Sequence, residues 1–392
     1  MKSAATISRN TWKRFNPISY LPINTSGSSD KLLLFVAVSL AAFGLVMVYS
    51  ASYIFSQEKF GDGLYYFNHH LVFLAIGFVG MTIGRFLDLR VLQRMALPIF
   101  AGSLGLIGLT LVPGIAHRAG GASRWINVGG FSLQPVEFAK IALVIMMAKI
   151  LAKENRDWNK ITTGFLYFLW PALLTIALCM AQPDFGSTAL VIAVTAFLLY
   201  LAGVHGKFLL GAAAPVIPLL AAAMILAPYR RARLMTFLDP WADPQGAGFQ
   251  IVQSFIAFYR GGLFGAGLGA SRAKVFYLPE AHNDFILSVV GEELGFLGIG
   301  VLSFVFLVLI FRGIRAAAKT GERFHSLLAA GLTILLGLEV FWNASVVLGL
   351  FPNKGMNMPF ISSGGSSIIC ALSIVGLLLN VSAQQGRGAC AA

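Results

Sequence analysis

The stretch from Asp284 to Phe311, DFILSVVGEELGFLGIGVLSFVFLVLIF, decides the fold class. Its charged side chains are Asp284 at the start and the pair Glu292-Glu293, and the remainder is apolar or small. An apolar run of about 20 residues is long enough to cross the hydrocarbon core of a bilayer as a helix. The stretch therefore predicts a transmembrane helix, and a carboxylate at its mouth is costly to keep there unless it has a function.

The composition of the whole chain supports this interpretation. Of its 392 residues, 57% are hydrophobic and 11% are charged, whereas a soluble globular protein carries roughly 25% charged residues. The charged side chains are too few to cover a water-facing surface, so lipid must be the solvent for most of the chain. The composition excludes a soluble globular domain and predicts an all-α membrane protein.

Apolar runs of membrane length recur along the sequence. We expect about ten transmembrane helices in a single polytopic domain over residues 31–382. Pro215 and Pro218 lie inside the seventh run and predict a kink there. The runs cover residues 32–52, 69–87, 95–114, 135–152, 164–181, 186–203, 208–227, 284–311, 326–350 and 366–382.

The Lys and Arg residues predict the orientation in the membrane. The net charge is +13, and most of the 29 basic residues fall on the side of the two termini. Cytoplasmic loops carry an excess of Lys and Arg. Both termini are therefore expected in the cytoplasm, as a flexible arm over residues 1–30 and a tail over 383–392. Because the basic residues are dispersed among the spans, nucleic-acid binding is not expected.

One large outer loop, residues 228–283 between the seventh and eighth runs, opposes this charge trend. A loop of this length is uncommon unless it is functional, and we expect a short amphipathic helix inside it at about 247–259, which includes Gln253. Anionic lipid headgroups outside the membrane, or an anionic ligand at the outer mouth, would explain its charge; Arg suits phosphate. Its basic residues are Arg230, Arg231, Arg233, Arg260, Arg272 and Lys274.

Three further outer segments carry polar groups. In the first, which includes Arg124, Glu137 falls near a helix start and Lys140 follows three residues later on the same face. This pair is either a self-neutralising helix end or part of a cavity lining. In the second, Asp184 is either a helix cap or a cavity residue. The third segment, 351–367, adds the outer positive charge of Lys354.

Asp284 itself admits two interpretations. It is a favourable first-turn acid beside a local cap at His282 or Asn283, or it begins an acid-lined helix face that continues to Glu292. Glu292 and Glu293 are as well explained as anchors of helix packing. Glu339, inside the ninth run, is expected to have an interior partner.

These residues limit the chemistry. The order of residues supports no Ser-His-Asp or Cys-His site, no nucleotide-binding fingerprint is present, and the spacing around His282 specifies no zinc site. A carboxylate base and cations at an outer cavity suit a lipid-linked phosphate substrate. A lipid transporter, or flippase, would use similar parts, and a non-enzymatic scaffold is a further alternative.

Seven motifs follow one another from the third run to the tenth. They are Arg124-Trp125-Ile126, Gln134 to Lys140, Gln182 to Ser187, Phe237 to Trp241, Tyr277 to Phe285, Gly291 to Gly295 and Pro359 to Ser367. Their content and order resemble the SEDS family (shape, elongation, division and sporulation proteins). Asp239 to Pro244 and Glu280-Ala281-His282 look more like the division member than the elongation member, and elongation is the nearest alternative within the family.

The resemblance implies ten spans and a glycosyltransferase that polymerises lipid II into glycan strands at the septum. The growing glycan would be the donor, would leave undecaprenyl pyrophosphate, and would be transferred to the 4-hydroxyl of another lipid II. The family's essential acid matches Asp284, as a general base, and its important lysines match Lys140 and Lys354. Glu137 would orient Lys140, and Arg233 with Lys354 would hold pyrophosphate. The other expected cavity residues are Arg124, Asp184 and Gln253.

The resemblance also implies partners and a location. A class B penicillin-binding protein of the FtsI type would supply transpeptidase activity, and other divisome membrane proteins would bind at the bacterial inner membrane. A divalent cation, magnesium or manganese, is left open because the residues specify no metal site. The sequence departs from the family pattern at Val136, Asn283 and Ser363, where Ser, Thr and Tyr are usual; none of these changes removes an acid or a base.

Overall fold

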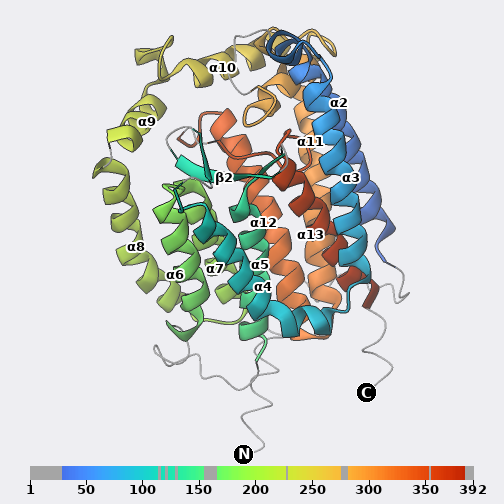
Figure 1. Ribbon diagram of the computed structural model, residues 1–392, viewed down its shortest axis with the longest axis vertical. Helices are drawn as coiled ribbons and strands as arrows, with labels where there is room; N and C mark the ends of the chain where they lie inside the picture. Colours follow the sequence, from blue (N-terminus) through green and yellow to red (C-terminus); the bar gives the residue numbers. More distant parts are fainter. Residues whose placement is uncertain are drawn as a thin grey trace, which may run out of the picture.

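The computed structural model is a bundle of long helices with a small sheet near one end (Figure 1). Helices α9 and α10 lie across that same end of the bundle, beyond the long helices (Figure 1). The structure describes residues 29–113, 116–119, 122–128, 131–153, 166–226, 228–274, 281–352 and 355–384. Most of the expected arm, residues 1–28, and most of the expected tail, residues 385–392, lie outside these ranges.

Each of the ten apolar runs predicted from the sequence overlaps one helix. Six of these helices, α2, α3, α4, α11, α12 and α13, are long and apolar enough to cross a membrane, and α6 and α7 are shorter apolar helices. A multi-pass, mainly helical membrane protein is therefore confirmed, and the count of ten spans stays a prediction. The helices are α2 (Lys31–Phe60), α3 (Tyr65–Phe86), α4 (Leu89–Leu109), α5 (Pro135–Leu151), α6 (Tyr167–Ala181), α7 (Phe185–Leu201), α8 (Gly206–Leu226), α11 (Ile286–Lys319), α12 (Arg323–Val347) and α13 (Gly365–Ala383).

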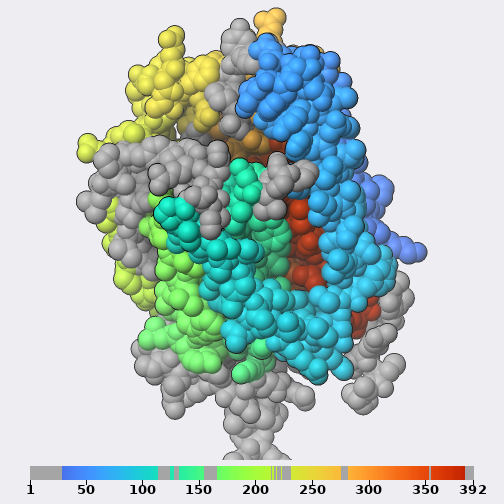
Figure 2. Space-filling view, viewed as in Figure 1, coloured from blue at the N-terminus to red at the C-terminus, as the bar shows by residue number. Residues whose placement is uncertain are grey.

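The core of the bundle is centred on α12 and α13, whose spanning windows are 61% and 83% buried. Helix α13 packs against α3, and α5 packs against α4 and α12. Atoms of α13 show between α3 and α4 on the face drawn in Figure 2. Large apolar side chains such as Phe35, Phe86 and Phe304 remain exposed on the outer helices, as expected where lipid is the solvent.

Hydrogen bonds and an ion pair tie together the helix ends at one end of the bundle. The side chain of Asp30 caps α2 by accepting from Leu33 N at 3.0 Å, and its Oδ2 lies 2.5 Å from Nη2 of Arg312 on α11. The N–H of Asp30 donates to Ser382 Oγ of α13 at 3.0 Å. The start of α2 and the ends of α11 and α13 therefore lie together.

A three-stranded antiparallel sheet corrects the expectation of an all-α fold. Strands β1 (Ala116–Ala119), β2 (Ala122–Val128) and β3 (Phe131–Leu133) pair in that order. The sequence signal for this sheet is the Gly120-Gly121 pair and the Gly129-Gly130 pair, because Gly-Gly between short runs is typical of a tight hairpin. The sheet leads directly into α5, whose first residue is Pro135.

The expected outer loop contains more helix than predicted. Helix α10 (Phe249–Gly261) confirms the amphipathic helix expected at 247–259. Helix α9 (Pro228–Leu238) and the short 3-10 helix η2 (Pro240–Ala242) were not expected. Helix α8 continues through Pro215 and Pro218, and a kink there stays a prediction.

Helix α11 is interrupted at Gly295, which has φ 68° and ψ −167°. The carbonyls that lose their helical partners are used by the glycine-rich segment after α10: Ala266 N donates to Glu292 O at 2.9 Å and Gly267 N to Glu293 O at 3.0 Å. The segment after α10 also provides an acceptor, because Phe296 N donates to Gly262 O at 2.9 Å. The glycine-rich segment thus supplies partners for backbone groups on both sides of the break, as a backbone within a membrane requires.

Candidate functional site

Asp284 lies in a turn over residues 281–285 that immediately precedes α11. The turn corrects one expectation: α11 begins at Ile286, so Asp284 does not share a helix face with Glu292. The N-cap position is Phe285, whose side chain makes no capping hydrogen bond, so neither His282 nor Asn283 occupies the N-cap. Asp284 is half-buried at the mouth of the bundle.

Hydrogen bonds from two other segments hold this turn. Asn343 Nδ2 of α12 donates to Asp284 O at 2.9 Å and also to Met356 O at 2.6 Å. From the segment before α13, Ser362 Oγ donates to Asn283 O at 2.7 Å. Ser363 N donates to His282 O, and the Ser363 hydroxyl donates to Asn283 Oδ1. Asn283 and Ser363, both departures from the family pattern, thus bond to each other.

The Asp284 carboxylate faces the backbone of this second segment. A Cβ added at Gly355 would lie only 2.0 Å from Oδ2 of Asp284. The next residue toward the N-terminus, Lys354, is outside the described residues. Phe360, on the same segment, is 1% exposed and adopts φ 68°, a conformation that costs a non-glycine residue on the order of 1–3 kcal/mol and that clusters at functional sites.

Lys140 lies at the centre of a buried cluster of two carboxylates. Its Nζ is 2.8 Å from Glu137 Oε1 and 2.5 Å from Glu339 Oε1, and the residue is 3% exposed. The structure therefore confirms an interior partner for Glu339 and the pairing of Glu137 with Lys140. The contact between Lys140 and Glu339 was missed because 199 residues separate them in sequence.

Helix α12 connects this cluster to the Asp284 turn. Glu339 is one turn before Asn343, whose side chain donates to the carbonyl of Asp284. The start of α5 is also fixed to α13, because Gln134 N donates to Ser366 Oγ at 2.8 Å. Lys140 is thus placed to act on the turn through α12 and has little surface of its own.

Arg124 and Asp184 brace the outer ends of neighbouring elements. Arg124 on β2 donates from Nη2 to Pro183 O at 2.6 Å. The Asp184 carboxylate caps α7, accepting from Ser187 N at 3.2 Å and from Ser187 Oγ at 2.8 Å, and the residue is 1% exposed. The capping interpretation of Asp184 is the one that the structure supports.

Glu292 and Glu293 anchor the packing of α11. This was one of the two alternatives from the sequence, the other being an acid-lined face of a cavity. Glu292 Oε2 accepts from Ser271 Oγ at 2.5 Å and from Ala273 N at 3.0 Å. Glu293 Oε1 lies 2.9 Å from Lys274 Nζ. Both glutamates are 1% exposed, so neither acid lines an open cavity.

The basic residues of the outer loop divide into two groups. Lys274 is buried and paired with Glu293, so it serves the fold, whereas Arg260 is exposed and its Nη1 approaches Glu292 Oε1 at 3.9 Å. Arg231 and Arg272 are exposed, and Arg233 is half-buried on α9. The charge count alone could not separate the two groups.

Gln253 lies half-buried on α10, close to the start of α11. Its neighbour Ser254 shares a 2.8 Å hydrogen bond with Ser288 Oγ on α11 and donates to Val347 O at 2.7 Å. Helix α10 therefore covers the start of α11 and the end of α12. Gln253 stays a predicted substrate contact.

A metal site is not evident among the residues that the structure describes: no three His, Cys, Asp or Glu side chains gather there in a way that could hold an ion. The chemistry available at this end includes a half-buried carboxylate on a braced turn and the exposed Arg231 and Arg272. Such a carboxylate can accept a proton from a hydroxyl group, and arginines can bind phosphate.

Comparisons with known proteins agree with this arrangement. A family model for FtsW, RodA and SpoVE, described as a cell cycle protein, matches residues 30–387. The probable peptidoglycan glycosyltransferase FtsW of Geobacter sp. (strain M18) is 45% identical over 360 residues, which cover 92% of this chain and 98% of the relative.

Two solved structures have the same fold. A chain of a peptidoglycan synthase complex, described as coordinating polymerization and crosslinking, gives a TM-score of 0.74 at 27% identity, over 91% of this chain and 98% of that one. The rod shape determining protein RodA of Thermus thermophilus gives a TM-score of 0.67 at 26% identity, over 91% of this chain and 97% of that one.

Proposed function

Since the chain belongs to the FtsW, RodA and SpoVE family of cell cycle proteins, we propose that it is a peptidoglycan glycosyltransferase that polymerises lipid II into glycan strands. The observation that carries the mechanism is the half-buried Asp284 carboxylate, presented on a turn that α12 and the segment before α13 hold by hydrogen bonds. A braced carboxylate at a membrane mouth is suited to general-base catalysis.

In the proposed reaction, Asp284 accepts the proton of the 4-hydroxyl of the incoming lipid II. The hydroxyl oxygen attacks the anomeric carbon of the growing glycan, the new glycosidic bond forms, and the bond from that carbon to the pyrophosphate oxygen breaks. The electron pair of the broken bond leaves on undecaprenyl pyrophosphate. Positive groups near that oxygen would lower the barrier by stabilising the developing charge.

The cations assigned to this task are Arg233 and Lys354. Arg233 is half-buried on α9, and Lys354 precedes Gly355, whose backbone lies against the Asp284 carboxylate. Lys140 acts as a positioning residue, because its ammonium is enclosed by Glu137 and Glu339.

The finer topology follows from the same proposal. The ten helices that match the apolar runs would all span the bacterial inner membrane, with both termini in the cytoplasm and α9–α10 in an outer loop between the seventh and eighth spans. Helix α8 brings the chain to the end of the bundle at which α9 and α10 lie (Figure 1). The septum is the proposed location, because the relative named above is an FtsW.

A class B penicillin-binding protein is the proposed partner. The support is the similarity to a chain of a peptidoglycan synthase complex that coordinates polymerization and crosslinking. Other membrane proteins of the divisome would bind the outer loops and the exposed apolar faces of the spans. The proposal assigns no role to a divalent cation, and the assay is run with and without magnesium or manganese.

The test is polymerisation of labelled lipid II by the full-length protein purified with its cognate transpeptidase. Asp284→Asn should lower the rate by roughly 10²–10⁴-fold, the usual contribution of a general base. The matched control is Asp62→Asn, which removes the same charge from an exposed acid at the α2–α3 connection. Wild-type protein that forms no polymer but moves lipid II across vesicles would identify a flippase and overturn the proposal, and a fully active Asp284→Asn would remove Asp284 from the mechanism.

Elongation rather than division is the alternative that the RodA similarity supports. The two roles differ in the transpeptidase that activates the enzyme. Co-purification and activation by the division-type transpeptidase, without activation by the elongation-type one, supports the septal role; the opposite preference assigns the chain to elongation.

A further inference from the structure

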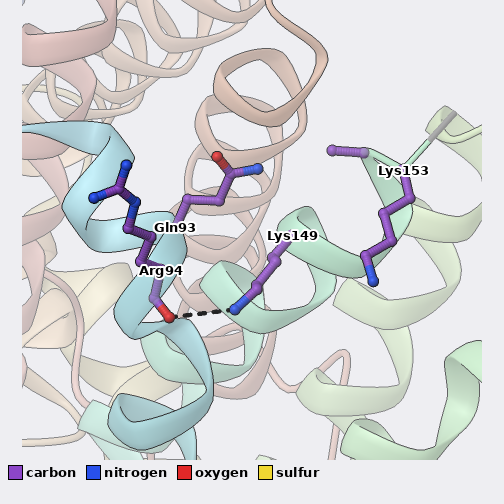
Figure 3. A pocket seen from close by; sticks show the side chains of 5 residues that line it. Gln93, Arg94, Lys149 and Lys153 are labelled. Atoms are coloured by element: carbon purple, nitrogen blue, oxygen red, sulfur yellow. Dashed lines mark hydrogen bonds between the residues drawn. The ribbon is translucent and has the colours of Figure 1, made fainter.

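The adjoining ends of α4 and α5 form a basic cavity that the proposed function does not use. Its volume is 390 Å³, and Gln93, Arg94, Lys149, Ala152 and Lys153 line it (Figure 3). Lys149 is in the last turn of α5 and Lys153 is two residues past its end, and Lys149 reaches across to α4. A cavity with this lining is built to accept a negative charge.

The cavity lies at the opposite end of the bundle from Asp284. Arg94 is near the start of α4, which directly follows α3, and Asn380 near the end of α13 donates to Leu87 O between those two helices at 2.6 Å. The same end holds Asp30 and Arg312. Since 26 residues of helix separate Ile286 from Arg312 on α11, the two ends are roughly 40 Å apart.

The lysines of this cavity keep most of their hydrogen-bonding capacity. Lys149 Nζ donates to Arg94 O at 3.3 Å (Figure 3), which uses one of the three donors of an ammonium group. Among the described residues, no carboxylate forms an ion pair with Arg94, Lys149 or Lys153. In the larger cavity at this end, by contrast, Asp30 supplies a negative charge.

The surface beside the cavity is apolar. Val91 and Met95 flank Arg94 on the same side of α4 and are 45% and 47% exposed. The Arg94 guanidinium extends along α4 on the side away from Lys149 (Figure 3). A basic recess that opens beside an exposed apolar helix face matches a molecule with an anionic head and apolar tails, whereas a free phosphate would use only the recess.

We propose that this cavity binds the phosphodiester headgroup of an anionic phospholipid, with Lys149 and Lys153 as its main ligands and the acyl chains along α4. Gln93 would donate its amide N–H groups to the phosphate oxygens, and Arg94 would add positive charge at the rim. Basic pockets between membrane helices on the cytoplasmic side are a known means of binding anionic headgroups. The site would retain one lipid at the end of the molecule remote from the polymerisation chemistry.

Native mass spectrometry of the full-length protein in detergent tests the proposal. The ligands are phosphatidylglycerol, phosphatidylcholine and free glycerol 3-phosphate, each titrated separately. We expect phosphatidylglycerol to bind roughly tenfold more tightly than phosphatidylcholine, and Lys149→Gln/Lys153→Gln to remove that difference, as the loss of two surface cations predicts. The control, Lys207→Gln/Arg315→Gln, removes the same charge outside the cavity and should change the affinity by less than about twofold.

Three results would overturn the proposal. The first is equal loss of binding in the control, which would assign the effect to the general charge of this end. The second is equal affinity for glycerol 3-phosphate and phosphatidylglycerol, which would identify a free-anion site. The third is loss of binding in Lys149→Arg/Lys153→Arg, which keeps both charges. An unchanged melting temperature and gel-filtration profile establish that each variant is folded.

Discussion

Asp284 and the Glu292-Glu293 pair are only eight and nine residues apart in sequence, yet their environments differ. Asp284 is half-buried on a turn whose backbone is braced by Asn343. Glu292 and Glu293 are 1% exposed and are held by hydrogen bonds and ion pairs, among them the pair of Glu293 with Lys274 at 2.9 Å. Acids that look alike in the sequence therefore have different tasks, which are set by the partner and the access of each carboxylate.

The comparison also explains why the outer basic residues are not one group. Lys274 is buried in an ion pair with Glu293 and so neutralises buried charge, while Arg260 is exposed and lies 3.9 Å from Glu292. The exposed Arg231 and Arg272 remain available to an anionic substrate. A positive charge on the outer side of a membrane protein is evidence for a ligand only after its internal partners are known.

The largest expected effect separates the two kinds of acid by activity. Asp284→Asn should lower lipid II polymerisation by roughly 10²–10⁴-fold and change the melting temperature in detergent little, because the hydrogen bonds that hold the turn go to Asp284 O and to Asn283, which the substitution keeps. Glu293→Gln should lower the melting temperature and leave the rate of lipid II polymerisation by the folded protein close to that of the wild type. Equal losses of activity at unchanged melting temperature in both variants would show that the distinction is wrong.

The next effect concerns stability. Lys274→Ala leaves Glu293 buried and without its cation, and breaking such a pair costs about 3–5 kcal/mol. We expect a strongly lowered melting temperature and low yield of folded protein. Lys274→Met/Glu293→Gln removes both charges while keeping an acceptor for Ser50 Oγ, which lies 2.7 Å from Glu293 Oε1, and should recover most of the stability. If the double variant is no more stable than Lys274→Ala, the ion pair is not the anchor.

A smaller effect is expected at the break in α11. Gly295 has φ 68°, and a Cβ there would lie 2.3 Å from the N of Gly265. Gly295→Ala should destabilise the protein by at least about 2 kcal/mol, from the unfavourable conformation and the displaced segment. Protease cleavage within residues 261–274, compared with the wild type, measures the displacement. Gly300→Ala is the control, because nothing lies within 4 Å of its added Cβ.

The smallest effect is expected at Asp184, whose carboxylate caps α7. Asp184→Ala should cost about 1 kcal/mol and Asp184→Asn, which keeps a capping oxygen, much less. Thermal unfolding in detergent measures both. If Asp184→Asn instead abolishes polymerisation at normal stability, Asp184 is a cavity residue, as first expected, in addition to being a cap.

The sequence predicted the elements that depend on local pattern. Apolar runs located the ten helices, because burial in lipid needs only length and hydrophobicity. The same reasoning found α10 and the pairing of Glu137 with Lys140, which lie three residues apart on one helix. It missed the small sheet and α9, because the apolar pattern carries little information about short segments that are not continuously apolar.

The sequence by itself thus determined the solvent of the chain, its helices, and the presence of a carboxylate at the mouth of α11. The tertiary structure decided which charges are partners: Lys140 with Glu339, Lys274 with Glu293 and Arg312 with Asp30. The partners in these contacts are 199, 19 and 282 residues apart in the chain. Local spacing cannot specify them, since an ion pair depends on where packing places the two side chains and on how much water it excludes.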